Sequence, residues 1–208
     1  MSIKAVVFDI GNVLVQWSPN DFYDSQIGPD RRRTFFDAVP IEAMNTEVDR
    51  GAPFAQSVAD LAGAHPDWHD EIMLWQSGWP KMFSPQIDLS VHLMQALQAK
   101  GMPVFSLTNF GVETYEIGAE IYPIMRRFDR DFISGHMQVI KPDPRIFEML
   151  EKASGLSGDA LIFTDDSAKN IAAAAERGWR THHFTDPQGW ADRLVAEGLL
   201  TREEARQG

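Results

Sequence analysis

The amino-acid sequence predicts an α/β fold in which helices cover a parallel sheet and a separate helical segment is inserted. Short runs rich in β-branched and aromatic residues alternate with longer stretches of helical periodicity. Several of these short runs are mostly apolar, as expected of strands buried on both faces of a parallel sheet. About ninety residues separate the first two runs, which is far more than a strand-helix-strand crossover requires.

Five strands are expected, and three of them end at residues that carry chemistry. The first run is followed by Asp9, the second by Thr108-Asn109 and the fourth by Thr164-Asp165-Asp166. The carboxyl ends of parallel strands lie at one edge of a sheet, where ligand sites of open α/β folds form. The expected strands cover residues 3–8, 103–107, 131–134, 160–163 and 180–184.

The insertion between the first two strands is expected to form a helical cap domain. Its helical patterns cover residues 31–38, 41–49, 52–63 and 67–79, separated by glycine and proline. The predicted division gives a core domain of residues 1–16 and 86–208 and a cap domain of residues 17–85. Some cap side chains are candidates for a substrate pocket, although a solvated helix face or cap packing explains them equally well: Glu47, Asp49, Arg50, Trp75 and Trp79.

The remaining helices are expected to connect the strands of the core. The pattern at 86–100 places apolar residues on one face and stops at Gly101. Further helical patterns cover residues 113–121, 145–153, 168–177 and 187–200.

Composition excludes several classes of protein. Nineteen lysines and arginines against thirty acidic residues give a net charge of −11, which would repel a nucleic acid. The chain has no cysteine, so it has no disulfide framework, thiolate metal site or thiol nucleophile. No apolar run approaches the roughly 20 residues that span a bilayer, and no signal segment is evident. We therefore expect a cytoplasmic enzyme that binds neither nucleic acid nor membrane.

Each polar cluster has an ordinary structural explanation when it is considered alone. Asp9 is explained by a turn, Thr108-Asn109 and Asp165-Asp166 by helix N-caps, and Lys141 by a solvated side chain. Asp143 is expected to cap a helix that begins at Pro144. Together, however, these clusters follow strands of a single sheet, which indicates one shared crevice.

The four clusters resemble the motifs of the haloacid dehalogenase (HAD) superfamily, in the same order and over nearly the whole chain. The motif forms and the long helical insertion are similar to the bacterial sugar-phosphate phosphatase branch, which includes α-glucose-1-phosphate phosphatases. The resemblance implies a Rossmann-like parallel sheet of order 3-2-1-4-5 with an inserted helical cap domain. The matching segments are Phe8-Asp9-Ile10-Gly11-Asn12-Val13, Leu107-Thr108-Asn109, Lys141-Pro142, and Phe163-Thr164-Asp165-Asp166 with Asn170.

The resemblance also implies a magnesium-dependent phosphatase acting on a small phosphate monoester, such as a sugar phosphate. Asp9 would attack phosphorus and form an aspartyl-phosphate. Two unit charges 4 Å apart repel by about 4 kcal/mol at an effective dielectric of 20, so the attack on a dianion needs a cation. The implied Mg²⁺ ligands are Asp9, the backbone carbonyl of Gly11 and Asp165, with Asp166 as a direct or water-bridged partner.

The remaining motif residues would bind the phosphoryl group. Lys141 would pair with Asp9 and the transferring phosphoryl group, while Thr108 and the backbone of Asn109 would hold phosphate oxygens. One residue departs from the family pattern, because Gly11 occupies the position of a second aspartate that acts as general acid and base. The loss of such a group costs typically about 10² to 10⁴ in rate.

Two alternatives remain open at this point. A 2-haloacid dehalogenase uses the same fold and also lacks the second acid, but it takes a carboxylate substrate and needs no metal. A catalytically weak phosphatase fold that serves as a binding module would also explain Gly11. The sequence does not identify the physiological substrate, the group that replaces the missing acid or the oligomeric state.

Overall fold

The computed structural model describes residues 2–206 and contains a five-stranded parallel sheet. The strand order is β5-β4-β1-β6-β7, with every neighbouring pair parallel. Numbered among themselves, these strands follow the expected order 3-2-1-4-5, so the predicted fold class is confirmed. The five strands are β1 (Ala5–Phe8), β4 (Val104–Thr108), β5 (Arg130–Ile133), β6 (Leu161–Asp165) and β7 (Arg180–His183).

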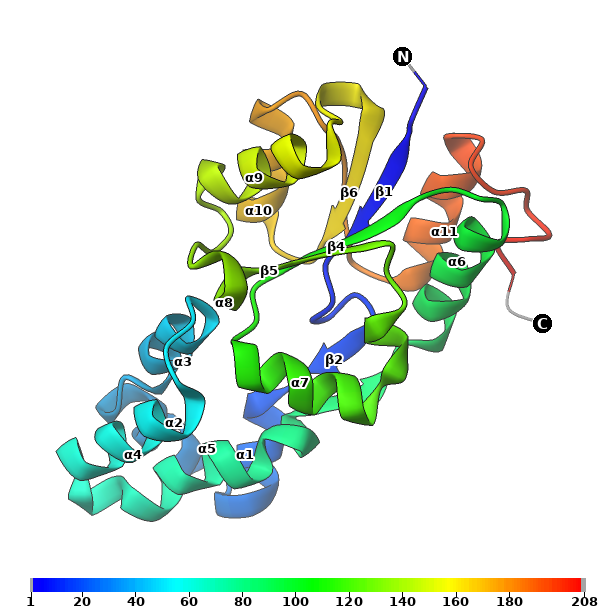
Figure 1. Ribbon diagram of the computed structural model, residues 1–208. Coiled ribbons are helices and arrows are strands. Elements are labelled where there is room, and N and C mark those ends of the chain that lie inside the picture. The colour runs from blue at the N-terminus through cyan, green and yellow to red at the C-terminus, as the bar shows by residue number, and fades with distance from the viewer. Residues whose placement is uncertain (1, 207–208) are drawn as a thin grey trace.

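Helices cover both faces of this sheet because alternate side chains of each strand point to opposite sides. Figure 1 shows α9 and α10 on one face and α6 and α11 on the other. In β1, Val7 belongs to the apolar cluster under α9, and Val6 to the larger cluster under α6 and α11. The helices of the core are α6 (Asp88–Ala99), α7 (Val112–Ile121), α8 (Ser134–Met137), α9 (Pro144–Ser154), α10 (Ala168–Glu176) and α11 (Pro187–Ala196).

The start of α9 follows the expectation from its sequence. Asp143 is the N-cap residue, and its side chain accepts a hydrogen bond from the backbone N–H of Arg145. Pro144 occupies the first helical position, where its missing N–H leaves no hydrogen bond unmade.

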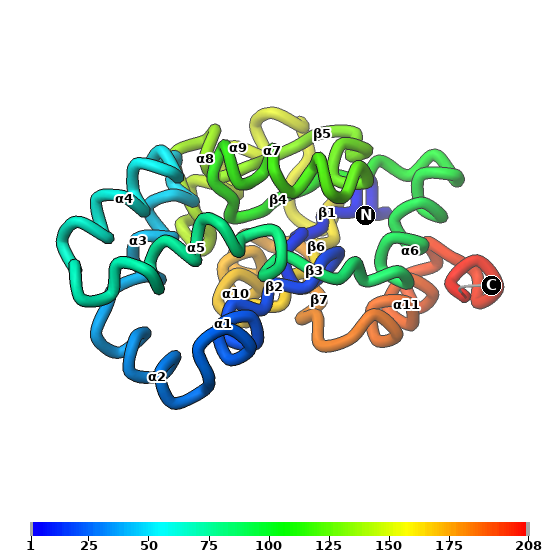
Figure 2. The backbone as a smooth tube through the Cα atoms, turned by 90° about the horizontal axis from the view of Figure 1, so that it is seen from below, coloured from blue at the N-terminus to red at the C-terminus, as the bar shows by residue number. Residues whose placement is uncertain are grey.

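The insertion folds into a group of helices at the carboxyl end of the sheet (Figures 1 and 2). Several helix ends in the insertion differ from the predicted ones by one or two residues, and two differences are larger. The segment Pro19–Ile27 forms a helix that we did not expect, and the last helix continues through Pro80 to Met82 instead of ending at Trp79. The elements are α1 (Pro19–Ile27), α2 (Pro29–Ala38), α3 (Ile41–Asp49), α4 (Phe54–Ala64), the short 3₁₀ helix η1 (Pro66–Trp68) and α5 (His69–Met82).

A two-stranded antiparallel ribbon, which the sequence did not predict, joins the insertion to the core. It pairs β2 (Val15–Trp17) with β3 (Phe83–Gln86). The proposed division of the chain at residues 17 and 85 runs through this ribbon and stays a prediction. Two further 3₁₀ helices, η2 (Pro123–Arg126) and η3 (Gly158–Ala160), lie in core loops. None of the described helices combines the length and the apolar character that crossing a membrane demands.

Candidate active site

Asp9 lies directly beyond β1, at the centre of the sheet's carboxyl edge. Its backbone N–H donates to the carbonyl of Thr164 (3.0 Å), which extends the parallel pairing of β1 with β6 by one residue. The side chain turns into the site, where Oδ1 accepts from the backbone N–H of Ile10 (2.7 Å). Burial raises the pKa of Asp9 to about 7, and the charges of Asp165 and Asp166 add to this increase, whereas Lys141 opposes it. A second cation beside Asp9 would therefore stabilise its carboxylate form.

Lys141 is a buried ammonium group surrounded by oxygen atoms. Its Nζ donates to Asp165 Oδ2 (2.6 Å) and to the carbonyl oxygen of Leu107 (2.7 Å), and it lies 3.0 Å from Asp9 Oδ2. Burial alone would lower the pKa of Lys141, but the two carboxylates outweigh burial and hold that pKa above its usual range. Lys141 is therefore charged and links the ends of β1, β4 and β6.

The backbone of Lys141 is fixed by the side chain of Asn109. Asn109 Nδ2 donates to the carbonyl of Lys141 (3.0 Å), and Asn109 Oδ1 accepts from its N–H (2.8 Å). This reciprocal pair uses both polar atoms of the amide. The Asn109 side chain thus positions Lys141, in addition to the expected role of the Asn109 backbone at the phosphate.

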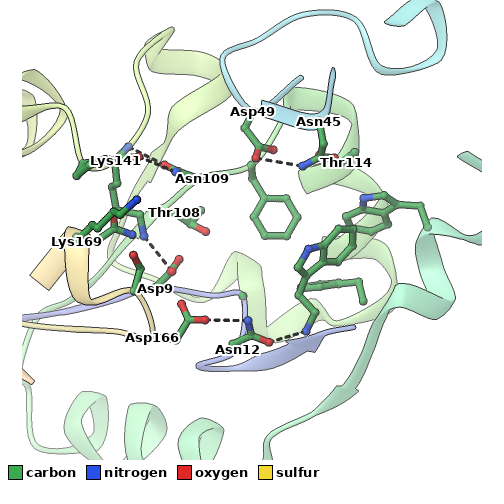
Figure 3. A pocket seen from close by; sticks show the side chains of 18 residues that line it. Asp9, Asn12, Asn45, Asp49, Thr108, Asn109, Thr114, Lys141, Asp166 and Lys169 are labelled. Carbon is green, nitrogen blue, oxygen red and sulfur yellow. Dashed lines mark hydrogen bonds and ion pairs between the residues drawn. The ribbon is translucent and has the colours of Figure 1, made fainter. Parts of the chain in front are cut away.

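The two acids after β6 differ in their surroundings. Asp165 is fully buried, and both of its carboxylate oxygens already accept hydrogen bonds from within the protein. The donors are Lys141, the side chain of Asn170 and the backbone N–H of Ser167. Asp166 is half-buried at the cavity wall, where its Oδ2 accepts from Asn12 Nδ2 (2.8 Å) (Figure 3).

The carboxylates of Asp9, Asp165 and Asp166 form a cluster that fits a divalent cation of the magnesium type. One oxygen from each lies within 4.8 Å of the others. Opposite ligands of an octahedral Mg²⁺ ion are about 4.2 Å apart, so a small contraction would allow oxygens of this cluster to share one ion. All the donors are oxygen, which Mg²⁺ prefers, and the three carboxylates exceed the one positive charge of Lys141.

A cavity of about 370 Å³ opens above this cluster, between the core and the cap. All the predicted site residues except Asp165 line it, and Asp165 lies behind them. An aromatic wall of this cavity is formed by the side chains of Trp17, Trp79, Phe83 and Phe110. The predicted site residues in the lining are Asp9, Gly11, Thr108, Asn109, Lys141 and Asp166.

Of the five cap side chains proposed as pocket residues, two line the cavity and three do not. Asp49 and Trp79 line the cavity, whereas Trp75 is buried behind it, and Glu47 and Arg50 form an exposed ion pair with each other (2.5 Å).

Asn12 belongs to the first motif but had no role assigned to it. Several other lining residues were not singled out from the sequence, among them Trp17, Asn45, Phe110 and Thr114. The position of Asn45 one helical turn before Asp49 is a signal that could have identified it.

Comparison with known proteins places this site in a family. The family model described as haloacid dehalogenase-like hydrolase matches residues 3–178. The chain belongs to the haloacid dehalogenase-like hydrolases. This HAD-like hydrolase is thus an enzyme of the superfamily that its four motifs indicated.

Two curated relatives cover most of the HAD-like hydrolase. A sesquiterpene phosphatase of Aspergillus oryzae is 26% identical over 188 residues, which are 89% of this chain and 91% of the relative. A D-ribitol-5-phosphate phosphatase of Bacteroides thetaiotaomicron is 23% identical over 203 residues, covering 93% of this chain and 97% of the relative.

Solved structures share the fold. A HAD family enzyme of Bacteroides thetaiotaomicron aligns with a TM-score of 0.74 at 18% identity, over 93% of this chain and 99% of the other. Another crystal structure of that enzyme is a complex with magnesium and inorganic phosphate (TM-score 0.65, 20% identity, 87% and 93% of the two chains). An L-2-haloacid dehalogenase of Xanthobacter autotrophicus aligns with a TM-score of 0.61 at 16% identity, over 95% and 84%. The fold is thus common to both classes of enzyme.

Proposed function

We propose that this HAD-like hydrolase is a magnesium-dependent phosphatase that cleaves a small phosphate monoester through an aspartyl-phosphate on Asp9. The observation that carries the proposal is the joint arrangement of Asp9, buried Lys141 and open Asp166 at the floor of one cavity. A carboxylate nucleophile with a fixed ammonium group and an acidic cation site suits attack on a phosphate dianion. The curated phosphatase relatives support the same reaction class.

The residues that would hold Mg²⁺ are Asp9, Asp166 and the backbone carbonyl of Gly11. When bound, the ion would neutralise charge on the phosphoryl oxygens. We place Asp165 in a supporting position, because both of its oxygens are engaged by Lys141, Asn170 and the Ser167 N–H.

The remaining steps belong to the chain's own residues. Asp9 attacks phosphorus, and the buried ammonium of Lys141 stabilises the charge that accumulates on the phosphoryl oxygens. The Thr108 hydroxyl and the backbone of Asn109 bind further phosphate oxygens at the end of β4. Water then hydrolyses the aspartyl-phosphate and regenerates Asp9.

The cavity favours a hydroxylated leaving group such as a sugar or polyol. Its aromatic wall provides apolar contact for a carbon skeleton, while Asn45, Asp49 and Thr114 present polar groups. The hydroxyl groups of a sugar or polyol could form further hydrogen bonds with these side chains, whereas a wholly apolar alcohol could not. A sugar phosphate is therefore the proposed substrate class, with glucose 1-phosphate as the member that the motif forms favour.

Dehalogenation is the weaker candidate. A 2-haloacid is an anion, and because its dehalogenation needs no metal, no bound cation would offset its repulsion by the acidic cluster. The open carboxylate of Asp166 at the cavity wall would repel a 2-haloacid. Asp166 has no cationic partner among its hydrogen bonds in the described structure, only Asn12 Nδ2 and, at its backbone carbonyl, a ring nitrogen of His183.

One experiment separates the candidate functions. The purified protein is assayed with magnesium against sugar phosphates, polyol phosphates and an aryl phosphate, and in parallel for chloride release from 2-chloropropionate. Phosphate release that disappears in Asp9→Asn is expected. Chloride release without phosphate release would favour the dehalogenase, and neither activity would indicate a binding module.

A further inference from the structure

The proposed reaction lacks a proton donor at the position where family phosphatases place one. Gly11 stands there and offers only backbone atoms. The alcohol that leaves phosphorus is a poor leaving group unless it is protonated as it departs. A proton donor elsewhere in the cavity would fill this role. Among the described residues that line it, Asp49 is the one carboxylate outside the metal cluster.

Asp49 reaches the cavity from the cap, as the last residue of α3. Figure 3 shows it on the side of the cavity opposite Asp166, next to Asn45. The two are separated by one helical turn, and Asn45 Nδ2 donates to Asp49 Oδ2 (3.3 Å). Leaving-group atoms that lie above a phosphoryl group on Asp9 would thus face Asp49.

A chain of hydrogen bonds fixes the orientation of this carboxyl group. The indole N–H of Trp75, which can only donate, is 3.2 Å from Asn45 Oδ1. The amide oxygen of Asn45 therefore faces Trp75, and its NH₂ group faces Asp49. The backbone N–H of Gly111 lowers the pKa of the Asp49 carboxyl group. Asp49 is held by neutral groups that donate to it, with no cation in direct contact among the described residues.

The backbone around Asp49 is clamped against the core. Ser134 Oγ donates to the backbone carbonyl of Asp49 (2.6 Å). The next turn requires glycine, because Gly51 has φ +106° and a Cβ there would lie 2.6 Å from the carbonyl oxygen of Gly135. A Cβ on Gly111 would lie 2.6 Å from Val48 Cγ1. Cap and core approach so closely at this point that Asp49 keeps a fixed place relative to Asp9.

Burial is the main influence that favours the protonated form of Asp49. Burial raises its pKa to about 8, the Gly111 N–H opposes this increase, the charge of Asp9 adds to it and the charge of Lys141 opposes it. On its own helix, Glu47 and Arg50 pair with each other, and His136 on the adjacent α8 is exposed. A carboxyl group that is protonated near neutral pH matches the requirement for a general acid.

We propose that Asp49 is the general acid and base of this enzyme, in place of the aspartate absent at Gly11. This inference rests on the proposed phosphatase function. In the first step Asp9 forms a bond to phosphorus, the ester P–O bond breaks, and the Asp49 proton goes to the departing oxygen to give the alcohol. In the second step a water molecule attacks phosphorus through its oxygen atom, and the Asp49 carboxylate takes a proton from that water. The Asp9–phosphorus bond then breaks, which releases phosphate and restores both side chains.

The test compares wild type with Asp49→Asn on phenyl phosphate and 4-nitrophenyl phosphate, two esters whose departing phenols differ in acidity. Because they carry no sugar hydroxyls, a loss of hydroxyl binding does not affect the comparison. We expect kcat/KM for phenyl phosphate to fall about 10²- to 10⁴-fold, and that for 4-nitrophenyl phosphate to fall less than about tenfold, because nitrophenolate departs unprotonated. Glu47→Gln is the matched control, since it removes an exposed acid of the same helix.

The pH profile supplies a second readout that a structural role would not change. A general acid must be protonated in the free enzyme, so wild-type kcat/KM for phenyl phosphate should fall as pH rises through the pKa of Asp49. That decline lies at or below about pH 8, because a cation on Asp9 removes part of the negative charge that raises this pKa. Asp49→Asn should abolish the decline, and Glu47→Gln should keep it.

Two results would overturn the inference. One is an Asp49→Asn enzyme that keeps phenyl phosphate turnover within about threefold of wild type. The other is an equal loss on both esters with an unchanged pH profile. Asp9→Asn is measured in parallel. If that variant retained activity, the proposed function itself would fail, whatever the behaviour of Asp49.

Discussion

Replacing Lys141 with methionine tests whether a single ammonium group holds the acidic cluster together. Methionine preserves much of the buried volume but removes the charge and all three hydrogen-bond and ion-pair contacts. Asp165, which is fully buried, then keeps only Asn170 and the Ser167 N–H as donors. Removing one partner of a buried ion pair costs about 3–5 kcal/mol, because the other charge remains in the interior.

The expected loss of stability is measurable by thermal and urea unfolding of the metal-free protein. For a chain of this size, each kcal/mol corresponds to about 2–4 °C, so Lys141→Met should lower Tm by roughly 6–20 °C. Saturating magnesium should recover part of this loss, because ligand binding to the native state adds about 2.7 kcal/mol at one hundred times Kd. Phosphate release should fall below detection in the same variant.

Lys169 provides the matched control for this prediction. It lines the same cavity, but its side chain is exposed. Lys169→Met should change stability by no more than about 0.5 kcal/mol, as surface substitutions usually do. If Lys141→Met cost less than 1 kcal/mol, or no more than Lys169→Met, the idea that Lys141 balances the buried carboxylates would be wrong.

Three further predictions concern the metal and the first motif. EDTA should abolish phosphate release and added magnesium should restore it; full activity in EDTA would refute the metal-dependent mechanism. Asp166→Asn should raise the magnesium concentration for half-maximal activity more than Asp165→Asn does, whereas Asp165→Asn should lower Tm more; titration and melting curves of both variants decide this. Gly11→Asp in the Asp49→Asn background should raise phenyl phosphate turnover at least tenfold, because a Cβ on Gly11 meets no atom within 4 Å and its φ lies outside the left-handed region. No gain in a folded, magnesium-binding double variant would mean that an acid at position 11 does not reach the leaving group.

The core of the fold was predictable because its signals are local. Each apolar strand and the polar residue that follows it are adjacent in the sequence, so Asp9, Thr108 and Asp166 were correctly placed at one edge of the sheet. The pattern at residues 41–49 gave the bounds of α3 without error. Long helices with capping signals and buried strands leave little freedom of interpretation.

The parts that were missed depend on contacts between distant segments. The ribbon of β2 and β3 has only three and four residues per strand, one of them Pro85, and its strands are far apart in the chain. Proline ordinarily argues against a strand and ends a helix, which also explains the wrong end expected for α5 at Trp79. The role of Asn45 is set by Trp75, thirty residues later. Nothing in the local sequence specifies that contact.

The side chain of Asn12 forms hydrogen bonds both to Asp166, a proposed metal ligand, and to the ribbon that leads to the cap. Its Nδ2 donates to Asp166, and its Oδ1 accepts from the backbone N–H of Trp17 (2.9 Å), at the start of the connection to the cap. One amide group therefore responds both to the ligand state of Asp166 and to the position of the aromatic wall. If cation binding favours the ordered ribbon, then the ordered ribbon binds the cation more tightly. A substrate that orders the same ribbon would therefore increase the affinity for the cation by the same factor. Such a coupling would make the metal affinity depend on whether substrate is bound, and the substrate affinity depend on whether the cation is bound.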